Sequence, residues 1–395
     1  MDEALMKEKL SMICRQFRLP GELLFYRWIP KGHINMSYYV ALFNGVEVKQ
    51  YVAQKINTYV FHDPAGLMRN IELVTQHILG KVNPVERRDR LHCHHTAEGK
   101  SYLVLKGGVP ADLADVSLDD DDVEVWRVYN YIEDSVSFES AEGDEKVLRL
   151  SGKAFGRFIR LLQNLDAGKL TETIPHFHDT RKRLEDFFDA VEKDVCGRAK
   201  EAAAEIELIR RYREFGESLC RQTDRGELPV RVTHNDTKTN NVLFDKKSLE
   251  PLVVIDLDTC MPGLVCYDFG DTIRFAACTA VEDEANGKQM KLDLALFRAY
   301  AEGFLGELSD VLTEAETESL PIGVAVITLE LATRFLTDYL TGDKYFRIDD
   351  PGHNLRRTQA QLALFQDMML HMEDMQSIIR DVAAAEKERV RIYVI

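Results

Sequence analysis

The sequence predicts an α+β chain of two lobes, in which strands dominate the first lobe and helices the second. Apolar and polar residues alternate between turn signals through about the first 130 residues, a pattern typical of β-strands. From about residue 148 the apolar residues recur every three or four positions, which is the spacing of amphipathic helices. Because 395 residues exceed one domain of roughly 100–200 residues, we place the lobes at 1–130 and 131–395.

The composition is that of an acidic globular protein. Hydrophobic residues make up 45% and charged residues 29% of the chain, so it has enough apolar side chains to fold around a core. The formal net charge of -16 repels nucleic-acid phosphates and anionic lipids. We therefore expect no nucleic-acid partner and no membrane partner.

The sequence also predicts a cytoplasmic protein. It contains no run of about 18 uncharged apolar residues, and its first segment, MDEALMKEKL, is charged and helical rather than a leader. The seven cysteines are odd in number and irregularly spaced, which indicates reduced thiols rather than a disulfide framework.

The first lobe contains a β-hairpin followed by one main helix. The Asn44-Gly45 dipeptide between two alternating segments is typical of a tight hairpin turn. We expect the acidic run at 119–122 to be a solvated turn, since like charges repel. The predicted elements are strands at 38–43 and 46–53, a helix with Leu67, Ile71, Val74 and Ile78 on one stripe, and strands at 101–105 and 123–132.

The second lobe is mostly helical, with one strand-rich interruption at 230–257. The first helical pattern begins near residue 148. Further helical patterns lie at 181–194, 199–222, 292–308, 319–340 and 355–385.

The strongest functional signal is VTHNDTKTNNVLF at 232–244, followed by PLVVIDLD at 251–258. Phosphoryl transfer needs a carboxylate that orients the attacking hydroxyl, together with oxygen ligands that hold Mg²⁺ against the phosphates. Asp236 followed five residues later by Asn241 matches the spacing of a kinase catalytic loop, and Asp256 ends an apolar strand. This pattern predicts a phosphotransferase site.

These residues resemble the aminoglycoside and choline phosphotransferase superfamily, whose loop reads H-x-D-x-x-x-x-N. The resemblance implies a protein-kinase-like fold and an enzyme that uses ATP and Mg²⁺. It implies that Asp236 is the catalytic base, that Asn241 and Asp256 are magnesium ligands, and that Asp268 holds the catalytic loop from behind. We add that Lys238 could neutralise charge on the transferred phosphoryl group.

Within the superfamily the chain is most similar to the bacterial N-acetylhexosamine 1-kinases. The similarity extends through the segments GHIN at 32–35, NTYVF at 57–61, YDFGD at 267–271 and RFLTDYLTGD at 334–343. It implies a sugar acceptor phosphorylated on its anomeric hydroxyl. The predicted metal ligand Asp256 is followed by Leu257-Asp258 rather than by Phe-Gly, and the chain has no A-P-E, so we do not expect a protein substrate.

Three further residues lie near the catalytic ones in the sequence. We expect His234 and Asn235 to brace the loop rather than to react. Asp258 has two open interpretations. Strand alternation would turn it towards the metal together with Asp256, whereas its position is equally suited to capping a helix.

The nucleotide side is predicted from the first lobe. The loop at 30–35, with Gly32, would cover the phosphates. The segment VAQK, ending at Lys55, resembles the strand that places a lysine on the α- and β-phosphates, and Glu72 on the next helix would pair with it. Asn130 and Ile132 mark the expected hinge, where backbone groups would bind adenine.

Two histidine-containing segments offer alternatives. His92, His94 and His95 surround a cysteine, but adjacent strand residues point to opposite faces and no second cluster completes a metal site. We therefore expect a hydrated strand. His178 precedes a helix that Asp179 would cap, and a ligand role for His178 is the alternative.

The acceptor side is predicted from the late segment at 334–345. Arg334 and Asp338 lie one helical turn apart and would bind sugar hydroxyls or an acetamido carbonyl, with Tyr345 flanking the ring. These positions, and His33 in the first lobe, resemble sugar contacts of the N-acetylhexosamine kinases. An intrahelical salt bridge is the alternative for Arg334 and Asp338.

Two further functions stay open. One is a kinase of the same fold for another alcohol, such as an aminoglycoside, choline or homoserine. The other is a pseudokinase that only binds its ligands, which the intact Asp236, Asn241 and Asp256 disfavour.

Overall fold

The computed structural model describes residues 3–30, 34–82, 88, 90–139, 143–278 and 290–393, which form two compact units. The first comprises Met1–Ser135 with Lys169–Ile174, and the second comprises Val136–Gly168 with Pro175–Ile395. A single boundary after residue 130 misses the return of 169–174 to the first unit. There the Asn70 amide accepts from Thr171 N at 2.9 Å and donates to Thr171 O at 2.7 Å.

The first unit is built on a six-stranded antiparallel sheet in the order β1-β2-β3-β6-β4-β5. The predicted hairpin is confirmed, because β2 and β3 pair across a turn in which Asn44 Oδ1 accepts from Val46 N and Glu47 N. The strands are β1 (Glu22–Ile29), β2 (Met36–Phe43), β3 (Val48–Ile56), β4 (Leu103–Lys106), β5 (Val109–Ala111) and β6 (Val123–Asn130), with a 3₁₀ turn at Leu113–Asp115.

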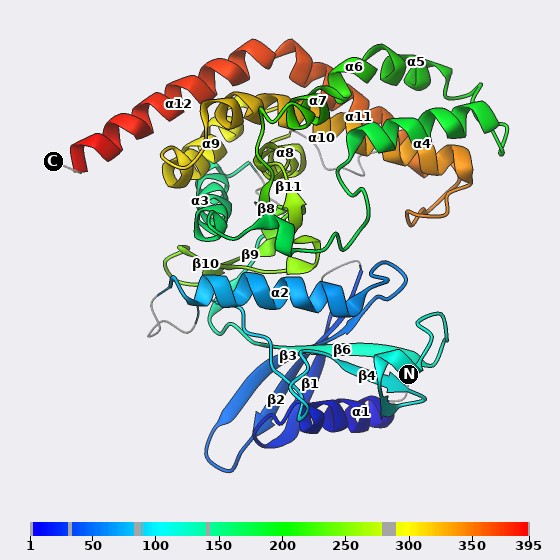
Figure 1. The fold of residues 1–395 in the computed structure, drawn as a ribbon, viewed down its shortest axis with the longest axis vertical. Coiled ribbons are helices and arrows are strands. Elements are labelled where there is room, and N and C mark those ends of the chain that lie inside the picture. Colours follow the sequence, from blue (N-terminus) through cyan, green and yellow to red (C-terminus); the bar gives the residue numbers. More distant parts are fainter. Residues whose placement is uncertain are drawn as a thin grey trace. The chain divides into compact units, whose positions relative to one another are not determined.

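Helices cover both faces of this sheet (Figure 1). Helix α1 (Glu3–Gln16) packs Leu10 and Ile13 into a core that includes Ala53 of β3 and Trp126 of β6. Helix α2 (Pro64–Leu79) lies on the other face, where its residue Met68 contacts the Arg127 guanidinium. Alternation along β3 and β6 therefore sends successive side chains to different helices.

The second unit is a helical body with short strands at its catalytic edge. Its helices are α3 (Glu145–Leu162), α4 (Thr180–Lys193), α5 (Ala203–Arg211), α6 (Arg213–Gly216), α7 (Ser218–Asp224), α8 (Val265–Ala276), α9 (Leu294–Leu308), α10 (Glu314–Thr341), α11 (His353–Leu370) and α12 (Met372–Tyr393), with 3₁₀ turns at Ala167–Lys169, Thr239–Asn241 and Leu257–Thr259. Strands β7 (Ser135–Val136), β9 (Val242–Asp245) and β10 (Pro251–Val254) form one sheet in the order β10-β9-β7, and β8 (Arg231–Thr233) pairs with β11 (Met261–Gly263).

The strand-rich first unit and the helical second unit confirm the predicted fold class. Two predicted helices are divided in the structure. The pattern at 199–222 forms α5, α6 and α7, which break at Tyr212 and Glu217, and the pattern at 355–385 breaks at His371 between α11 and α12. No Gly or Pro stands at these three positions, and the apolar periodicity continues through them. The sequence pattern therefore does not reveal where the helices break.

Helix α10 is the central helix of the second unit. It crosses α8 so closely that a Cβ on Gly270 would come within 2.8 Å of the Gly323 backbone. By length and composition alone α10 could span a membrane, but 78% of its most apolar window is buried inside the protein. Its apolar character is therefore accounted for by core packing. The helix also carries Glu330 and Arg334, so its placement orders the site described next.

Candidate active site

Asp236 lies at the centre of a polar cluster in the loop between β8 and β9. Its Oδ1 lies 3.0 Å from Lys238 Nζ. Asn241 Nδ2 donates to Asp236 Oδ2 at 3.2 Å and to the Asp236 carbonyl at 2.8 Å. The structure thus brings together three of the residues that the sequence assigned to the catalytic loop.

The charges in this cluster are complementary. Burial alone would raise the pKa of Asp236, but Lys238, followed by His234 and Asn241, more than offsets this effect, so the pKa lies below its ordinary value. The Asp236 carboxylate in turn raises the pKa of Lys238. At neutral pH the pair is an ionised carboxylate beside an ammonium group.

Helix α8 holds the catalytic loop from behind, as predicted for Asp268. The two oxygens of Asp268 accept from His234 N at 2.8 Å and from Asn235 N at 2.7 Å. One turn further along α8, Asp271 Oδ2 accepts from Thr237 N at 3.0 Å. Burial raises the pKa of Asp268 to about 6, against the lowering effect of its donors.

The sequence reasoning missed two residues of this support, Asp271 and Thr272. Asp271 is itself held by Arg274, whose Nη2 lies 2.9 Å from Asp271 Oδ1, and the Thr272 hydroxyl donates to the Thr237 carbonyl at 2.5 Å. Both residues follow Asp268 by three or four positions, so they share its helix face. That spacing was the available signal.

His234 and Asn235 brace the loop, as expected. His234 Nε2 donates to the Ile255 carbonyl at 3.0 Å, which joins the loop to the residue that follows β10, and its ring makes T-shaped contacts with Phe155 and Phe158. Asn235 Nδ2 donates to the Thr259 carbonyl at 2.9 Å. Asn235 has a left-handed φ of 63°, a strained backbone that the surrounding hydrogen bonds hold in place.

Asn241 and Asp256 fit the oxygen-ligand chemistry of Mg²⁺. Ile255 N donates to the Asn241 carbonyl at 2.9 Å. Asp256 is therefore the next residue after one that is hydrogen-bonded to the catalytic loop. Because Asn241 uses its amide nitrogen on Asp236, its Oδ1 is left for a metal. Asp256 is exposed and has a left-handed φ of 61°, a strain found mostly at functional sites.

Strand alternation, the basis of one of the two interpretations of Asp258, does not hold at this position. Strand β10 ends at Val254, and 257–259 form a 3₁₀ turn, so strand alternation no longer applies. Asp258 is 2% exposed.

Across the described ranges, no group of three or more His, Cys, Asp or Glu side chains is arranged to hold a metal. Asn241 and Asp256 alone would suffice as protein ligands, because Mg²⁺ takes most of its ligands from phosphates and water.

The predicted ion pair between Lys55 and Glu72 is wrong. Lys55 Nζ lies 3.1 Å from Glu124 Oε1, whereas Glu72 Oε1 lies 2.5 Å from His95 Nε2. Lys55 is two residues from Ala53 and therefore points to the α1 face of the sheet, where Lys9 of α1 also pairs with Glu124 at 3.0 Å. Gln54 is the residue of this segment that faces α2.

The α2 face of the sheet instead carries a polar row across three strands. Ser37 of β2, Gln54 of β3 and Arg127 of β6 lie directly opposite one another. Gln54 Nε2 donates to Ser37 Oγ at 2.8 Å, and Gln54 Oε1 accepts from Arg127 Nε at 2.8 Å.

The structure places two groups of the predicted hinge residue Asn130 in contacts with His92. Its N–H donates to the His92 carbonyl at 3.1 Å, and its side-chain oxygen accepts from His92 N at 2.6 Å. Asn130 thus fastens the 90–92 segment to the end of β6. The hinge at Asn130 and Ile132 stays a prediction. Gly32 and His33 lie outside the described residues.

Asp338 is not a substrate contact but an organiser of the loop that follows α10. It is 5% exposed. Its Oδ1 accepts from Lys344 N and Tyr345 N, both at 2.8 Å, and its Oδ2 accepts from Phe346 N at 3.0 Å and Asn354 Nδ2 at 2.9 Å. The expected joint binding with Arg334, and the alternative salt bridge between the two, are both wrong because these donors occupy the carboxylate.

Arg334 lies in a cage of three aromatic rings. Its guanidinium carbon is 5.3 Å from the ring centre of Phe177, 5.8 Å from that of Tyr345 and 5.7 Å from that of Phe346. Within the described part of the chain, no carboxylate pairs with this guanidinium. Its five N–H donors are therefore available to a ligand, and the 61% exposed Tyr345 lies beside them.

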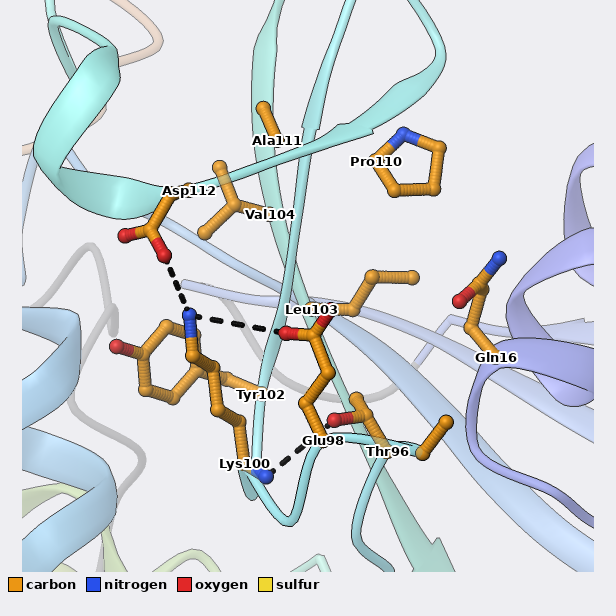
Figure 2. Close-up of a pocket in the computed structure, with 11 residues that line it drawn as sticks. Gln16, Thr96, Glu98, Lys100, Tyr102, Leu103, Val104, Pro110, Ala111 and Asp112 are labelled. Carbon is orange, nitrogen blue, oxygen red and sulfur yellow. Dashed lines mark hydrogen bonds and ion pairs between the residues drawn. The ribbon is translucent and has the colours of Figure 1, made fainter.

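A shallow cavity in the first unit contains none of the predicted site residues. It has a volume of about 240 Å³ and lies between α1 and the β4–β5 hairpin, and the ion pair of Lys100 with Asp112, 2.8 Å apart, closes one side (Figure 2). Both partners are exposed, so the cavity does not carry a catalytic assignment.

The family now follows from sequence comparison as well as geometry. Residues 92–304, more than half of the chain, match the model of the phosphotransferase enzyme family. The chain belongs to this family. It is an ATP-dependent phosphotransferase acting on an alcohol, in accordance with the catalytic loop described above.

Solved structures share the fold of this chain at low sequence identity. A microcompartment-associated aminopropanol kinase aligns with 92% of this chain and 98% of its own at 14% identity and a TM-score of 0.56. A spectinomycin phosphotransferase in complex with ADP and spectinomycin covers 94% and 99% at 13% identity and a TM-score of 0.55. A choline kinase from Cryptosporidium parvum covers 95% and 99% at 10% identity and a TM-score of 0.55.

Proposed function

We propose that this phosphotransferase acts in the cytoplasm and moves the γ-phosphate of ATP onto the anomeric hydroxyl of an N-acetylhexosamine. The observation that carries the choice of acceptor is the ring-caged, unpaired guanidinium of Arg334. It offers charge-assisted hydrogen bonds to the neutral oxygens of a sugar or its acetamido group, and the flanking tyrosine offers a surface for the sugar ring.

The charge around Arg334 disfavours cationic acceptors. Arg183 lies close enough for the charge of Arg334 to lower its pKa, second to the effect of burial. Arg183 donates to the Phe177 carbonyl at 3.2–3.4 Å, and Glu330 nearby is already paired with His178. Choline, aminopropanol and aminoglycosides carry positive charge, so two arginines that form no ion pair with any carboxylate among the described residues would repel them.

Asp236 would act mainly by orienting the acceptor hydroxyl. Its lowered pKa keeps it ionised and makes it a weak proton acceptor until the oxygen–phosphorus bond is well advanced, which suits the loose transition state of phosphoryl transfer. The neighbouring Lys238 would stabilise charge on the transferred group. The contact of 3.0 Å between Lys238 Nζ and Asp236 Oδ1 also fixes the position of the carboxylate.

Asn241 Oδ1 and the Asp256 carboxylate would hold Mg²⁺, which when bound neutralises the charge of the ATP phosphates. The strained backbone of Asp256 and the amide hydrogen bond of Asn241 orient these two groups. Both roles are testable by magnesium titration.

An acceptor panel tests the proposed function. The purified protein is incubated with ATP and Mg²⁺, and ADP release is measured with N-acetylglucosamine, N-acetylgalactosamine, choline, 1-amino-2-propanol, homoserine and spectinomycin. We expect the N-acetylhexosamines to give a kcat/KM at least tenfold above every amine, since a charge-assisted hydrogen bond is worth about 1.5–3 kcal/mol. Equal or greater turnover of an amine would contradict the acceptor assignment.

A further inference from the structure

The buried pair of His178 and Glu330 connects the acceptor side of the second unit to its catalytic loop. His178 Nδ1 lies 2.9 Å from Glu330 Oε1, and His178 Nε2 lies 3.0 Å from the Asn235 carbonyl. Asn235 directly precedes Asp236. The Glu330 side chain is 1% exposed, and its second oxygen accepts from the Thr180 hydroxyl at 2.6 Å.

The partners of His178 determine its protonation state. A carboxylate and a carbonyl only accept hydrogen bonds, so both ring nitrogens of His178 must donate. A histidine that donates from both nitrogens is an imidazolium. In a buried position that charge is tolerated only when it is paired, and Glu330 provides the pairing.

The same short segment contacts Arg334. The ring of Phe177, next to His178 in the sequence, forms one wall of the Arg334 cage. Arg334 itself lies one helical turn beyond Glu330 on α10. One segment therefore contacts both the residue before the proposed base and the proposed acceptor-binding arginine.

We propose that His178, held as an imidazolium by Glu330, is a positioning residue that fixes the Asn235 carbonyl and thereby orients the Asp236 carboxylate towards the acceptor bound at Arg334. The Asn235–Asp236 peptide is then fixed at both ends, because its N–H points to His234 Nδ1 at 3.3 Å. The proposal rests on the proposed role of Asp236, but it does not depend on which alcohol is the acceptor.

The surrounding charges favour the protonated form of His178. Burial alone would lower the pKa of His178, but Glu330 and the two hydrogen bonds raise it overall. Because the folded pKa is raised, the charged pair is lost as the pH rises through that value. The titratable and charged groups around the ring are Glu330 and Arg334 on α10, Arg183 on α4, and Tyr267, Asp268 and Asp271 on α8.

Glu330→Gln tests the proposal because it removes the charge and keeps the shape. We expect its kcat to stay within about threefold of wild type at pH 6 and to fall roughly tenfold or more at pH 8, where His178 loses its proton without the carboxylate. The KM for ATP should not change. His178→Gln should lower kcat by a similar factor at both pH values, and Thr180→Val, which keeps the His178–Glu330 pair, should retain the wild-type profile.

A purely structural pair would give a different result. It would lower the melting temperature of Glu330→Gln and leave the pH profile of kcat, per folded enzyme, superimposable on that of the wild type. That outcome overturns the proposal.

A ring-nitrogen NMR spectrum of the ¹⁵N-histidine-labelled wild-type protein at pH 7 gives an independent measurement that needs no variant. We expect both nitrogens of His178 to be protonated, and a single protonated nitrogen would overturn the proposal. Slow ATP hydrolysis, with water as acceptor, provides the kcat if no alcohol in the panel reacts. Failure of the sugar assignment is thereby distinguished from failure of the role of His178.

Discussion

The catalytic loop of the second unit and strand β3 of the first unit both carry family motifs, yet only the loop folds as its motif predicts. In the loop, Asp236, Lys238 and Asn241 converge within 3.0–3.2 Å. In β3, Lys55 turns away from Glu72 and pairs with Glu124. The difference shows that a motif predicts geometry well where the chain closes on itself and poorly where it runs extended.

The physical reason is the number of local constraints. The backbone of the loop at 234–237 is held by Asp268, Asp271 and Thr272, so a single helix fixes much of its conformation. A strand has two faces, and in this sheet both are covered, by α1 and by α2. Sequence alternation shows that Ala53 and Lys55 share a face, but it does not show which helix covers that face.

Asp236→Asn should have the largest effect, because it removes the group that orients the hydroxyl and accepts its proton. We expect kcat to fall by roughly 10²–10⁴. Calorimetric titration with ATP and Mg²⁺ should give a Kd close to that of the wild type, because the nucleotide does not need this carboxylate. A variant that keeps more than a tenth of the wild-type kcat would show that the loop is not catalytic.

Asp256→Ala should lower kcat by roughly 10²-fold, since a metal ion contributes several kcal/mol of charge stabilisation. It should also shift the magnesium dependence of activity to higher concentrations. Asp258→Asn is the matched control, and we expect its magnesium titration to overlay that of the wild type. If the two variants shift the curve equally, Asp256 is not the metal ligand.

Arg334→Ala should raise the KM for the sugar at least tenfold, since it removes a charge-assisted hydrogen bond worth about 1.5–3 kcal/mol. The KM for ATP should not change. Arg357→Ala is the control, because Arg357 also packs on a ring of α10, at 5.4 Å from the centre of Phe335, and is not assigned to the acceptor. Equal sugar KM values for wild type and Arg334→Ala would remove the support for the acceptor site.

The acceptor side shows why helical spacing failed to predict the contacts of Asp338. Arg334 and Asp338 have the spacing of an intrahelical pair, but the helix ends at Gly342 with a left-handed φ of 100°. The returning chain then brings the N–H groups of 344–346 onto Asp338. Helical periodicity ends where the helix ends, so it cannot predict contacts made by the loop beyond it.

The His178–Glu330 pair was beyond sequence reasoning for a related reason. The sequence correctly indicated that Asp179 caps α4, where its carboxylate accepts from Lys182 N at 3.1 Å. Glu330, however, lies 152 positions after His178 in a helix that reads as apolar core. Only the packing of α10 against α4 brings the two together.

Lys55→Met should have the smallest effect in the series. Because Lys55 lies on the α1 face and pairs with Glu124, we expect the KM for ATP to change by less than about threefold. The loss of a partly exposed ion pair should cost at most about 1 kcal/mol of unfolding free energy. A rise of tenfold or more in the KM for ATP would restore Lys55 as a phosphate ligand and contradict the side-chain placement reported for β3.

The most direct test of the central claim, that the acceptor is the anomeric hydroxyl of an N-acetylhexosamine, compares N-acetylglucosamine with its methyl β-glycoside. The methyl group blocks the anomeric hydroxyl and leaves the acetamido group and the other hydroxyls in place. With ATP and Mg²⁺ we expect ³¹P NMR to show a product phosphate coupled to the anomeric proton for the free sugar, and no product for the glycoside. Phosphorylation of both sugars at similar rates, or of neither, would contradict the claim.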